Sequence, residues 1–574
     1  MPVIPGKRLL LACGRFLVKP ATCYVAAWIA ALVVTGLMLH HSWTFFDAPP
    51  RPDKNCGHVF IDFAGQYVMG RMAVEGHAHE LYNRRIQREV VERCYPRKDE
   101  APLNEHTKEE REGHDDENLM FWFLGEDDPA AAARIGSVAA PLAARQPLGF
   151  ISLTACAASQ WQPSELKKAF FSRGGPLYPP VTAFLCYPLA LLRPQPAYRL
   201  MQIMTVLLTV VSALGVGVIS RGRIWWPVAL AAIVLFPGYD GNLNLGQNAV
   251  LTLTILIWGW ALVSRGRPVA GGAVWGLLVF KPVWAAAFFL VPVLTRRWRM
   301  ALAMIGVGAA LAAATLPLVG WQTWYDWLKI GQEAADTYLY DKNWILLSRD
   351  ALTLPRKLLD FQLPAAERRN NLAVLLAGWA IVLFVLEITV RLALFRKKEV
   401  RKPTGPGPAL IMLAAWVSCY HFMYYDVLLG FLPVALLFTE PRRYLELYAL
   451  AIVPLFKRGG AKIVPEHLRR ATPTRYPATI SLRRIGPSNV WMLNRVAPTA
   501  IVVMRVLYDY SSLSGTPVDT YCLLAFWTWC AWLVGIRWDS RARRLQRRRA
   551  PATLRLEKEE AAVGQLQMEG ERTS

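Results

Sequence analysis

Long uninterrupted runs of apolar residues are the feature that most limits how this chain can fold. A helix needs roughly 20 apolar residues to cross the hydrocarbon core of a bilayer. The stretches Ala21–His40, Tyr198–Ile219 and Asn371–Arg391 meet that requirement, and apolar residues make up 54% of the chain. The sequence therefore predicts an all-α integral membrane protein with about twelve spanning helices.

Basic residues gather in short segments between the apolar runs. Cytosolic loops of membrane proteins carry an excess of Lys and Arg, so we expect these segments and both termini in the cytosol. This placement, together with attraction to anionic membrane lipids, accounts for the net charge of +23 without a nucleic-acid partner. The basic clusters are Lys7–Lys19, Arg221–Arg223, Arg265–Arg267, Arg296–Arg299, Arg396–Lys402, Arg442–Arg443, Lys457–Arg484 and Arg537–Arg549.

A long polar segment follows the first apolar run. Between Glu80 and Asp128 it holds 15 acidic residues against 8 basic ones, so we expect it on the extracytoplasmic side. The predicted organisation is a cytosolic N-terminus (1–20), a first transmembrane helix (21–40), an extracytoplasmic loop with surface helices (41–176), a transmembrane catalytic core (177–456), a basic cytosolic loop (457–496), C-terminal transmembrane helices (497–536) and a basic cytosolic tail (537–574).

Two apolar stretches, Pro268–Thr295 and Pro408–Phe438, are too long for one upright helix and too short for two full spans. Each lies between basic clusters, so we expect a pair of short helices that enter from the cytosol, turn and return. The turns then carry Lys281 and the segment from His421 to Asp426. Ionisable residues at membrane depth are energetically unfavourable and by default line a functional cavity. A snorkelling Lys and a structural His are the plainer alternatives.

The motif Ile61-Asp62-Phe63-Ala64-Gly65-Gln66-Tyr67 places a carboxylate just after the first span, with Leu81-Tyr82-Asn83 about twenty residues further on. This pattern resembles the bacterial polyprenyl-phosphate-mannose-dependent mannosyltransferases, which are membrane glycosyltransferases of the GT-C class. The resemblance continues in order through Tyr178-Pro179-Pro180, Leu245-Gly246-Gln247-Asn248, Arg265-Gly266-Arg267-Pro268, Phe280-Lys281-Pro282, Arg296-Arg297-Trp298-Arg299 and the hairpin with His421.

The resemblance implies a GT-C-like helical bundle in the cell membrane, with a long outer loop after the first helix and an extracytoplasmic active site. It implies transfer of a sugar, mannose in that family, from a polyprenyl-phosphate donor to a glycan or glycolipid acceptor. Two departures leave the acceptor open. The loop between Asn83 and Tyr178 is longer than in the family, and Asn343-Trp344-Ile345-Leu346-Leu347-Ser348 replaces an Asn-Gln-Ser element.

The chemistry of such a transfer needs a base for the acceptor hydroxyl and a cation or donor for the departing phosphate. Asp62 is the candidate base, with a helix-flanking acid as its plainer interpretation. Lys281, His421 and Tyr424 are candidates for the donor phosphate. The candidate substrate-binding residues are Tyr67, Tyr178, Gln247, Asn248 and Asn343. Gln247 and Asn248 have an equally good interpretation as helix caps, together with Asn242 and Asn244.

The nine cysteines lack the spacing of a zinc site, and no cofactor is expected, although a divalent ion is left open. Cys56 and Cys94 both fall in the predicted outer loop, where they form either a disulfide or two free thiols.

A transporter or lipid flippase is the competing function, with Lys281 and His421 on broken helices as its substrate or proton sites. The two hairpins share no obvious sequence similarity, and a long acidic outer loop is not expected of a transporter. These two features favour the enzyme.

Overall fold

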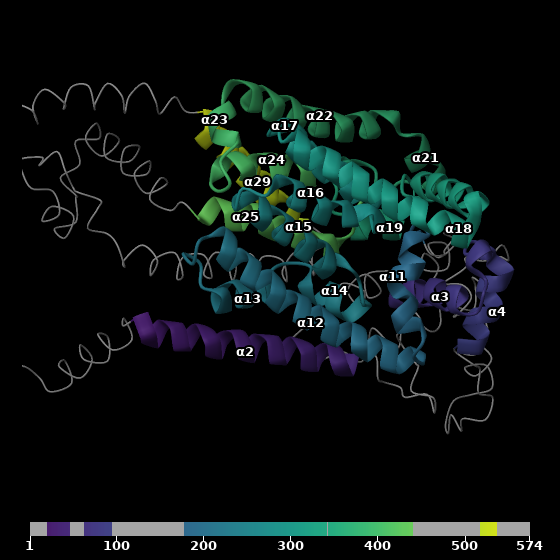
Figure 1. Ribbon diagram of the computed structural model, residues 1–574. Helices are drawn as coiled ribbons and strands as arrows, with labels where there is room; N and C mark the ends of the chain where they lie inside the picture. Colours follow the sequence, from purple (N-terminus) through teal and green to yellow (C-terminus); the bar gives the residue numbers. More distant parts are fainter. Residues whose placement is uncertain (1–19, 46–61, 95–176, 341, 440–516, 536–574) are drawn as a thin grey trace, which may run out of the picture.

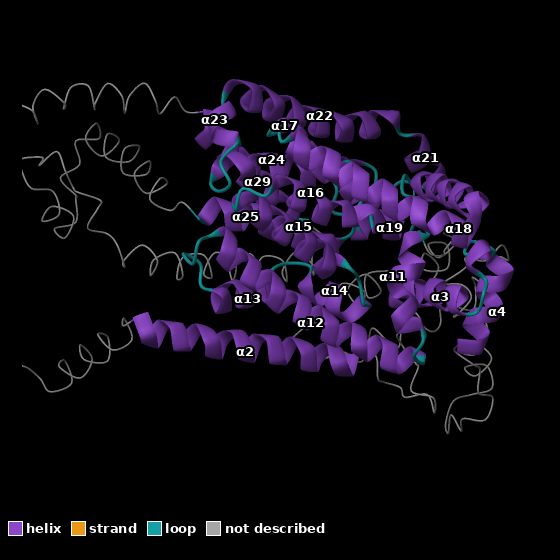
Figure 2. Ribbon diagram, in the orientation of Figure 1, coloured by secondary structure: helices purple, strands orange, loops and turns teal. Residues whose placement is uncertain are grey.

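Helices account for all of the regular structure in the part of the chain that the computed structural model describes, namely residues 20–45, 62–94, 177–340, 342–439 and 517–535 (Figures 1 and 2). Within these ranges there is no β-strand, and one isolated bridge pairs Ser348 with Met423. The all-α expectation is thereby confirmed for these residues. The predicted segments 457–496 and 537–574, and most of 1–20 and of the outer loop, lie outside them.

Five of the described helices are long and apolar enough to cross a bilayer. The bent pair α13 and α14, which meet at 72°, makes a sixth if it counts as one span. Their bounds are α2 Pro20–Phe45, α12 Pro194–Ile219, α13 Trp226–Leu235, α14 Tyr239–Leu245, α18 Trp298–Thr337, α22 Leu372–Phe395 and α29 Val518–Gly535. The protein is therefore a candidate multi-pass membrane protein.

The other apolar stretches form helices too short to span on their own, because a residue advances a helix by only about 1.5 Å. They are α11 Val181–Ala190, α15 Ala249–Ser264, α16 Pro268–Gly276 with η3 Leu277–Phe280, α17 Pro282–Leu294, α24 Pro406–Val417, and η4 Tyr424–Gly430 with α25 Phe431–Phe438. The remaining elements are α3 Asp62–Val74, η2 Ala78–Glu80, α4 Arg84–Cys94, α19 Lys342–Leu347, α20 Thr353–Leu359, α21 Ala365–Asn370 and α23 Lys397–Val400.

The first predicted hairpin consists of α16, η3 and α17. Gly272 of α16 lies against the backbone of Met300 at the start of α18, so a Cβ on Gly272 would come within 2.1 Å of the Met300 carbonyl oxygen. α18 follows α17 after a three-residue turn, so the chain leaves the segment on the side where it entered. The reversal falls at Lys281, as the sequence predicts.

The second hairpin is closed at its base by a hydrogen bond from the Gly405 amide to the Leu436 carbonyl, 3.0 Å long. α24 leads away from this bond, and η4 and α25 return to it. The tips of the two hairpins meet, because Lys281 pairs with Asp426 and the Cys419 thiol lies 3.7 Å from the Val283 carbonyl. Two segments far apart in sequence thus share one polar junction.

The described basic loops lie together on the side of the molecule opposite these tips. The Arg223 guanidinium donates to the Thr439 carbonyl, Arg297 to that of Arg401, and Arg396 to that of Gly535. The N-terminal end of α2 reaches the same side, where Tyr24 packs on Trp225. In Figure 1 this side lies at the left, near α23, while α3 and α4 lie at the right.

The long helix α18 bends at Gly320, whose φ of 76° is accessible to glycine but strained for other residues. Beyond the bend, Thr323 donates a hydrogen bond to the His79 carbonyl and Trp327 donates one to the Leu177 carbonyl. The second half of α18 therefore packs against η2 and the start of α11. With α3 and α4 it encloses the end of the bundle that holds the hairpin tips.

We predict that Gly272→Ala destabilises the fold, because the new Cβ would collide with the Met300 carbonyl and force α16 away from α18. Such overpacking costs about 1–3 kcal/mol. Gly306→Ala in α18 is the matched control, since nothing lies within 4 Å of its Cβ position. Thermal unfolding in detergent should show a lower midpoint for the Gly272 variant alone. Equal midpoints for the two variants would contradict the close approach of α16 and α18.

Candidate functional site

The junction of the two hairpins holds a buried ion pair. Lys281 lies between η3 and α17, and its Nζ is 2.6 Å from Asp426 Oδ1 in η4. The lysine and aspartate side chains are 11% and 4% exposed, so each charge depends on the other for compensation. The ring of Tyr425 lies 5.5 Å from the ammonium and adds a cation–π contact.

Asp62 is the first residue of α3 and stands beside this pair. The residue is open to solvent on one side, yet the protein around its carboxyl group desolvates it and raises its pKa above the ordinary value. The Gln247 side chain and the Lys281 charge lower the pKa, whereas the Asp426 charge raises it. Asp62, Gln247, Lys281 and Asp426 are therefore close enough to act on one another.

A small hydrogen-bonded network positions the loop before α15. Gln66 of α3 donates to the Gly246 carbonyl at 3.1 Å, and the Asn248 amide lies 3.5 Å from Gln66 Oε1. The Tyr178 hydroxyl donates to Gln247 Oε1 at 2.9 Å. Burial, and next the nearby Asp62 charge, raise the pKa of Tyr178. The network thus brings Tyr178, Gln247 and Asn248 together with the segment that carries Asp62.

The capping interpretation of this loop is confirmed for Asn242. Asn242 Oδ1 accepts a hydrogen bond from the Val250 amide in the first turn of α15, at 3.1 Å. Asn248 occupies the N-cap position of α15 but makes no side-chain capping bond. Its Oδ1, and the Nε2 of Gln247, are therefore not used to terminate the helix.

His421 lies at the tip of the second hairpin, with a φ of 47°. Its Nδ1 is 3.4 Å from Asp350 Oδ2 and 3.2 Å from Ser348 Oγ. Tyr338 stacks on the imidazole, with ring centroids 3.4 Å apart, and burial raises the pKa of Tyr338, as do the charges of Tyr420, Asp62 and Asp350. Tyr338 therefore lies near both His421 and Asp62.

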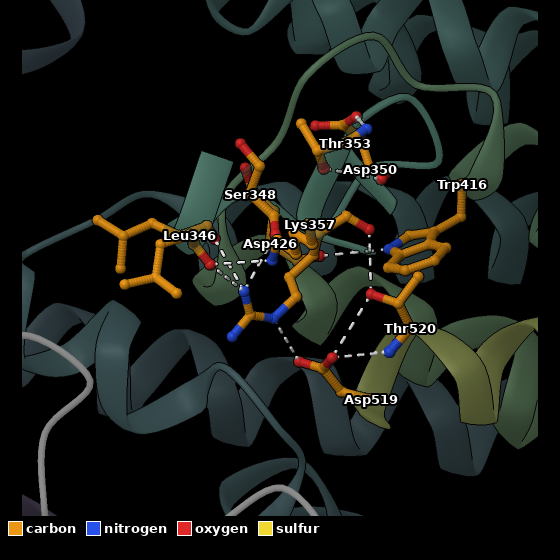
Figure 3. A network of polar contacts seen from close by, with 11 residues as sticks. Leu346, Ser348, Asp350, Thr353, Lys357, Trp416, Asp426, Asp519 and Thr520 are labelled. Carbon is orange, nitrogen blue, oxygen red and sulfur yellow. Dashed lines mark hydrogen bonds and ion pairs between the residues drawn. The ribbon is translucent and has the colours of Figure 1, made fainter. Parts of the chain in front are cut away.

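A buried polar network holds the segment that faces His421 (Figure 3). The Arg349 amide donates to the Phe422 carbonyl at 2.9 Å, and its guanidinium pairs with Asp519 of α29 at 3.1 Å. The Lys357 ammonium donates to the carbonyls of Leu346 and Ser348. Burial lowers the pKa of Lys357 well below its ordinary value. These contacts attach Ser348 and Asp350 firmly to the hairpin tip.

Several buried polar atoms around the tips have no hydrogen-bond partner among the described residues. They are Gln247 Nε2, Asn248 Oδ1, Trp284 Nε1, Asp350 Oδ2 and His421 Nε2. A buried polar atom left without a partner costs about 1–3 kcal/mol, so such atoms are rare unless a ligand or water completes them. Their gathering at one place indicates a binding site for a polar ligand.

Three of the predicted site residues have other surroundings. The Tyr67 hydroxyl donates to the Leu192 carbonyl at 2.8 Å and lies near Cys94, so an anchoring contact to the end of α11 accounts for it. The ring of Tyr424 is buried and packs against Gly241 of α14. Asn343 lies on α19, and its side chain is outside the described part of the structure.

Two further predictions concern the cysteines of the outer loop and a divalent metal ion. Cys94 has a free thiol, and Cys56 lies outside the described residues. Among the residues that the structure describes, no group of three or more His, Cys, Asp or Glu side chains is arranged to hold a metal ion.

Sequence reasoning missed how the charged residues pair. It assigned no partner to Asp426 or Asp350, whereas the structure places them beside Lys281 and His421. For Asp426 a signal was available, because a lysine at membrane depth requires a counter-ion and Asp426 lies in the partner hairpin. No comparable signal pointed to Asp519, whose partner Arg349 is 170 residues away.

Comparison with protein families identifies the class. The sequence model of glycosyltransferase family 87 matches residues 177–405, and over this part the chain belongs to that family. The protein is therefore a glycosyltransferase, and the family resemblance seen in the sequence is confirmed. Asp62 and His421 lie outside the matched residues, so their roles rest on geometry. No curated protein and no solved structure matches the chain.

We predict that Lys281→Met or Asp426→Leu alone lowers stability by about 3–5 kcal/mol, because each leaves one buried charge unpaired. The double variant leaves no unpaired charge and should recover much of the loss. Unfolding midpoints of the three variants measure this coupling. Strictly additive losses would contradict a paired Lys281 and Asp426.

Proposed function

We propose that the protein transfers a sugar, mannose, from a polyprenyl-phosphate donor to a glycan or glycolipid acceptor on the extracytoplasmic face of the cell membrane. The observation that carries the proposal is the position of Asp62 beside Gln247 and the Lys281–Asp426 pair, in a region where buried polar atoms lack partners. Membership of a glycosyltransferase family supports it independently.

Each side chain has a role that its surroundings favour. The Asp62 carboxylate accepts the proton of the acceptor hydroxyl as the new glycosidic bond forms, and its raised pKa makes it a stronger base than an ordinary aspartate. The bond between the anomeric carbon and the donor phosphate breaks, and the electron pair leaves with the phosphate. Lys281 and His421 stabilise the charge that develops there.

Substrate recognition falls to the loop before α15 and its neighbours. Asn248 Oδ1 is buried without a partner among the described residues, and the Gln247 amide lies beside the Asp62 carboxyl, so both can meet sugar hydroxyls or phosphate oxygens. Tyr178 holds the Gln247 amide in place through a hydrogen bond. Tyr67, Tyr424 and Asn343 complete the proposed set, with Tyr67 acting through its support of α3.

For the membrane topology, we place the side that carries the basic loops in the cytosol, since positive loops stay cytosolic. The hairpin tips and Asp62 then lie at the extracytoplasmic end, and both termini are cytosolic. If the short apolar helices complete spans together with their neighbours, the protein is a GT-C bundle of about twelve spans. A lipid-linked donor would then approach from the outer leaflet.

A transporter is the competing proposal. In transporters of this kind the substrate site lies near the bilayer midplane, between structural repeats. Here the polar groups are gathered at one end of the bundle, under α3, α4 and the second half of α18. That location favours an enzyme that meets its donor at the membrane interface.

We predict that Asp62→Asn lowers kcat for transfer by roughly 10²- to 10⁴-fold, the usual contribution of a general base. Purified protein in nanodiscs, supplied with radiolabelled polyprenyl-phosphate mannose and a membrane lipid extract, provides the assay. Glu387→Gln is the control, since this exposed residue of α22 pairs only with Arg391 on the same helix. Full activity in Asp62→Asn would reject Asp62 as the base. Transport of the donor without transfer would favour the transporter.

We also predict a shift in the pH profile of Gln247→Leu. The base must be ionised, so kcat/KM rises with pH through the pKa of Asp62. Because the Gln247 side chain lowers that pKa, its removal should move the acidic limb to higher pH. Gln322→Leu, an exposed change on α18, should leave the limb in place. An acidic limb of the kcat/KM profile that is unchanged, or that moves to lower pH, in Gln247→Leu would contradict the assignment of Asp62 as the base.

A further inference from the structure

The two ring nitrogens of His421 have different surroundings. Nδ1 is hydrogen-bonded to Ser348 Oγ at 3.2 Å, and Asp350 Oδ2 lies 3.4 Å from it as an ion-pair contact, with no hydrogen-bond partner of its own among the described residues. Nε2 is enclosed by protein and has no hydrogen-bond partner among the described residues. When one nitrogen of an imidazole faces a carboxylate, that nitrogen holds the proton and the other is left for a ligand.

We propose that Asp350 is a positioning residue that fixes the tautomer of His421, so that Nε2 is the atom presented to the phosphate of the lipid donor. The inference rests on the proposed function and adds to it, because it assigns Asp350 as the partner of His421 and Nε2 as the atom that meets the phosphate. The neutral ring carries its proton on Nδ1. To donate from Nε2 to a phosphate oxygen, the ring takes a second proton from solvent when the phosphate binds, and Asp350 stabilises the positive charge.

The geometry argues against a nucleophilic role for Ser348. In a Ser-His-Asp triad the serine hydroxyl and the carboxylate occupy opposite ring nitrogens. Here Ser348 and Asp350 both approach Nδ1, which carries the proton in the proposed tautomer, so no free ring nitrogen faces the hydroxyl to take its proton. The cluster therefore serves to orient the imidazole rather than to attack a substrate.

Burial and a hydrogen bond hold the Asp350 side chain in one orientation. It is 1% exposed, and its Oδ1 accepts a hydrogen bond from the Thr353 amide at 2.9 Å, which leaves Oδ2 for the histidine (Figure 3). The imidazole is held from its faces and edges by Tyr338, stacked at an interplanar angle of 18°, and by the edge of Trp344. Both partners of the contact are thus fixed before any ligand arrives.

The charges around the ring are consistent with this assignment. Asp350 is the carboxylate that faces it, and Tyr338, the residue after the end of α18, lies against its face. Three cations near Asp350 have other partners: Arg349 pairs with Asp519, Lys357 donates to backbone carbonyls, and Arg356 pairs with Asp360. A cationic imidazolium therefore meets a carboxylate on one side and the π face of an aromatic ring on another, both of which favour it.

The test uses Asp350→Asn in the full-length protein. Asparagine keeps the size of the side chain and the acceptor for the Thr353 amide, but offers Nδ1 an amide donor, which reverses the tautomer. Nitrogen NMR of ¹⁵N-histidine-labelled protein, with His421 assigned through His421→Gln, should show a protonated Nδ1 in the wild type and a protonated Nε2 in the variant. Polyprenyl phosphate without sugar should shift the Nε2 signal of the wild type.

Kinetics give a second measurement. Asp350→Asn should lower kcat roughly 10²- to 10⁴-fold, by analogy with the loss of an orienting carboxylate, with a smaller change in KM. Asp360→Asn is the matched control, because Asp360 is a buried acid that pairs with Arg356 on α20. It should leave the tautomer and kcat unchanged. Unfolding midpoints show whether either variant is simply unstable.

The outcomes separate this inference from the proposed function. If transfer occurs but His421 carries its proton on Nε2, or shows the same tautomer in Asp350→Asn, the positioning role is overturned and the enzyme stands. If the tautomer reverses and phosphate shifts Nε2, yet no sugar is transferred from polyprenyl-phosphate mannose, the positioning role stands and the proposed reaction fails.

Discussion

The ion pair between Lys281 and Asp426 is the contact on which the arrangement of the site depends. It joins the tips of two hairpins that are 145 residues apart, in surroundings where neither charge is stable alone. Around this pair the chain gathers Asp62, the Gln247 loop and the His421 tip. The polar site therefore lies where the tips of the two hairpins meet and their charges neutralise each other.

Much of this arrangement was predictable from local sequence. The lengths of the apolar stretches, flanked by basic clusters, predicted both hairpins and their turns. The motif around Asp62 predicted a carboxylate at the same end of the molecule. The pairing of Asp350 with His421, and of Arg349 with Asp519, was not predictable, because it depends on how distant helices pack. The number of spans was not predictable from local hydropathy either, since helices such as α11 and α15 are apolar but short.

The structure separates two kinds of positive charge. Arginines of the loops, such as Arg223 and Arg297, bind backbone carbonyls at one end of the bundle. Lys281 and His421 lie at the other end, each next to a carboxylate. This separation matches the proposal, in which one set of cations orients the fold in the membrane and another takes part in the chemistry.

The most direct test of the account is a cryo-electron microscopy structure with a non-reactive polyprenyl-phosphate sugar analogue bound. The account predicts the phosphate within hydrogen-bond distance of Lys281 Nζ and His421 Nε2, with the sugar beside Gln247 and its anomeric carbon facing Asp62. A phosphate bound among the basic loops at the opposite end, or an anomeric carbon remote from Asp62, would contradict it.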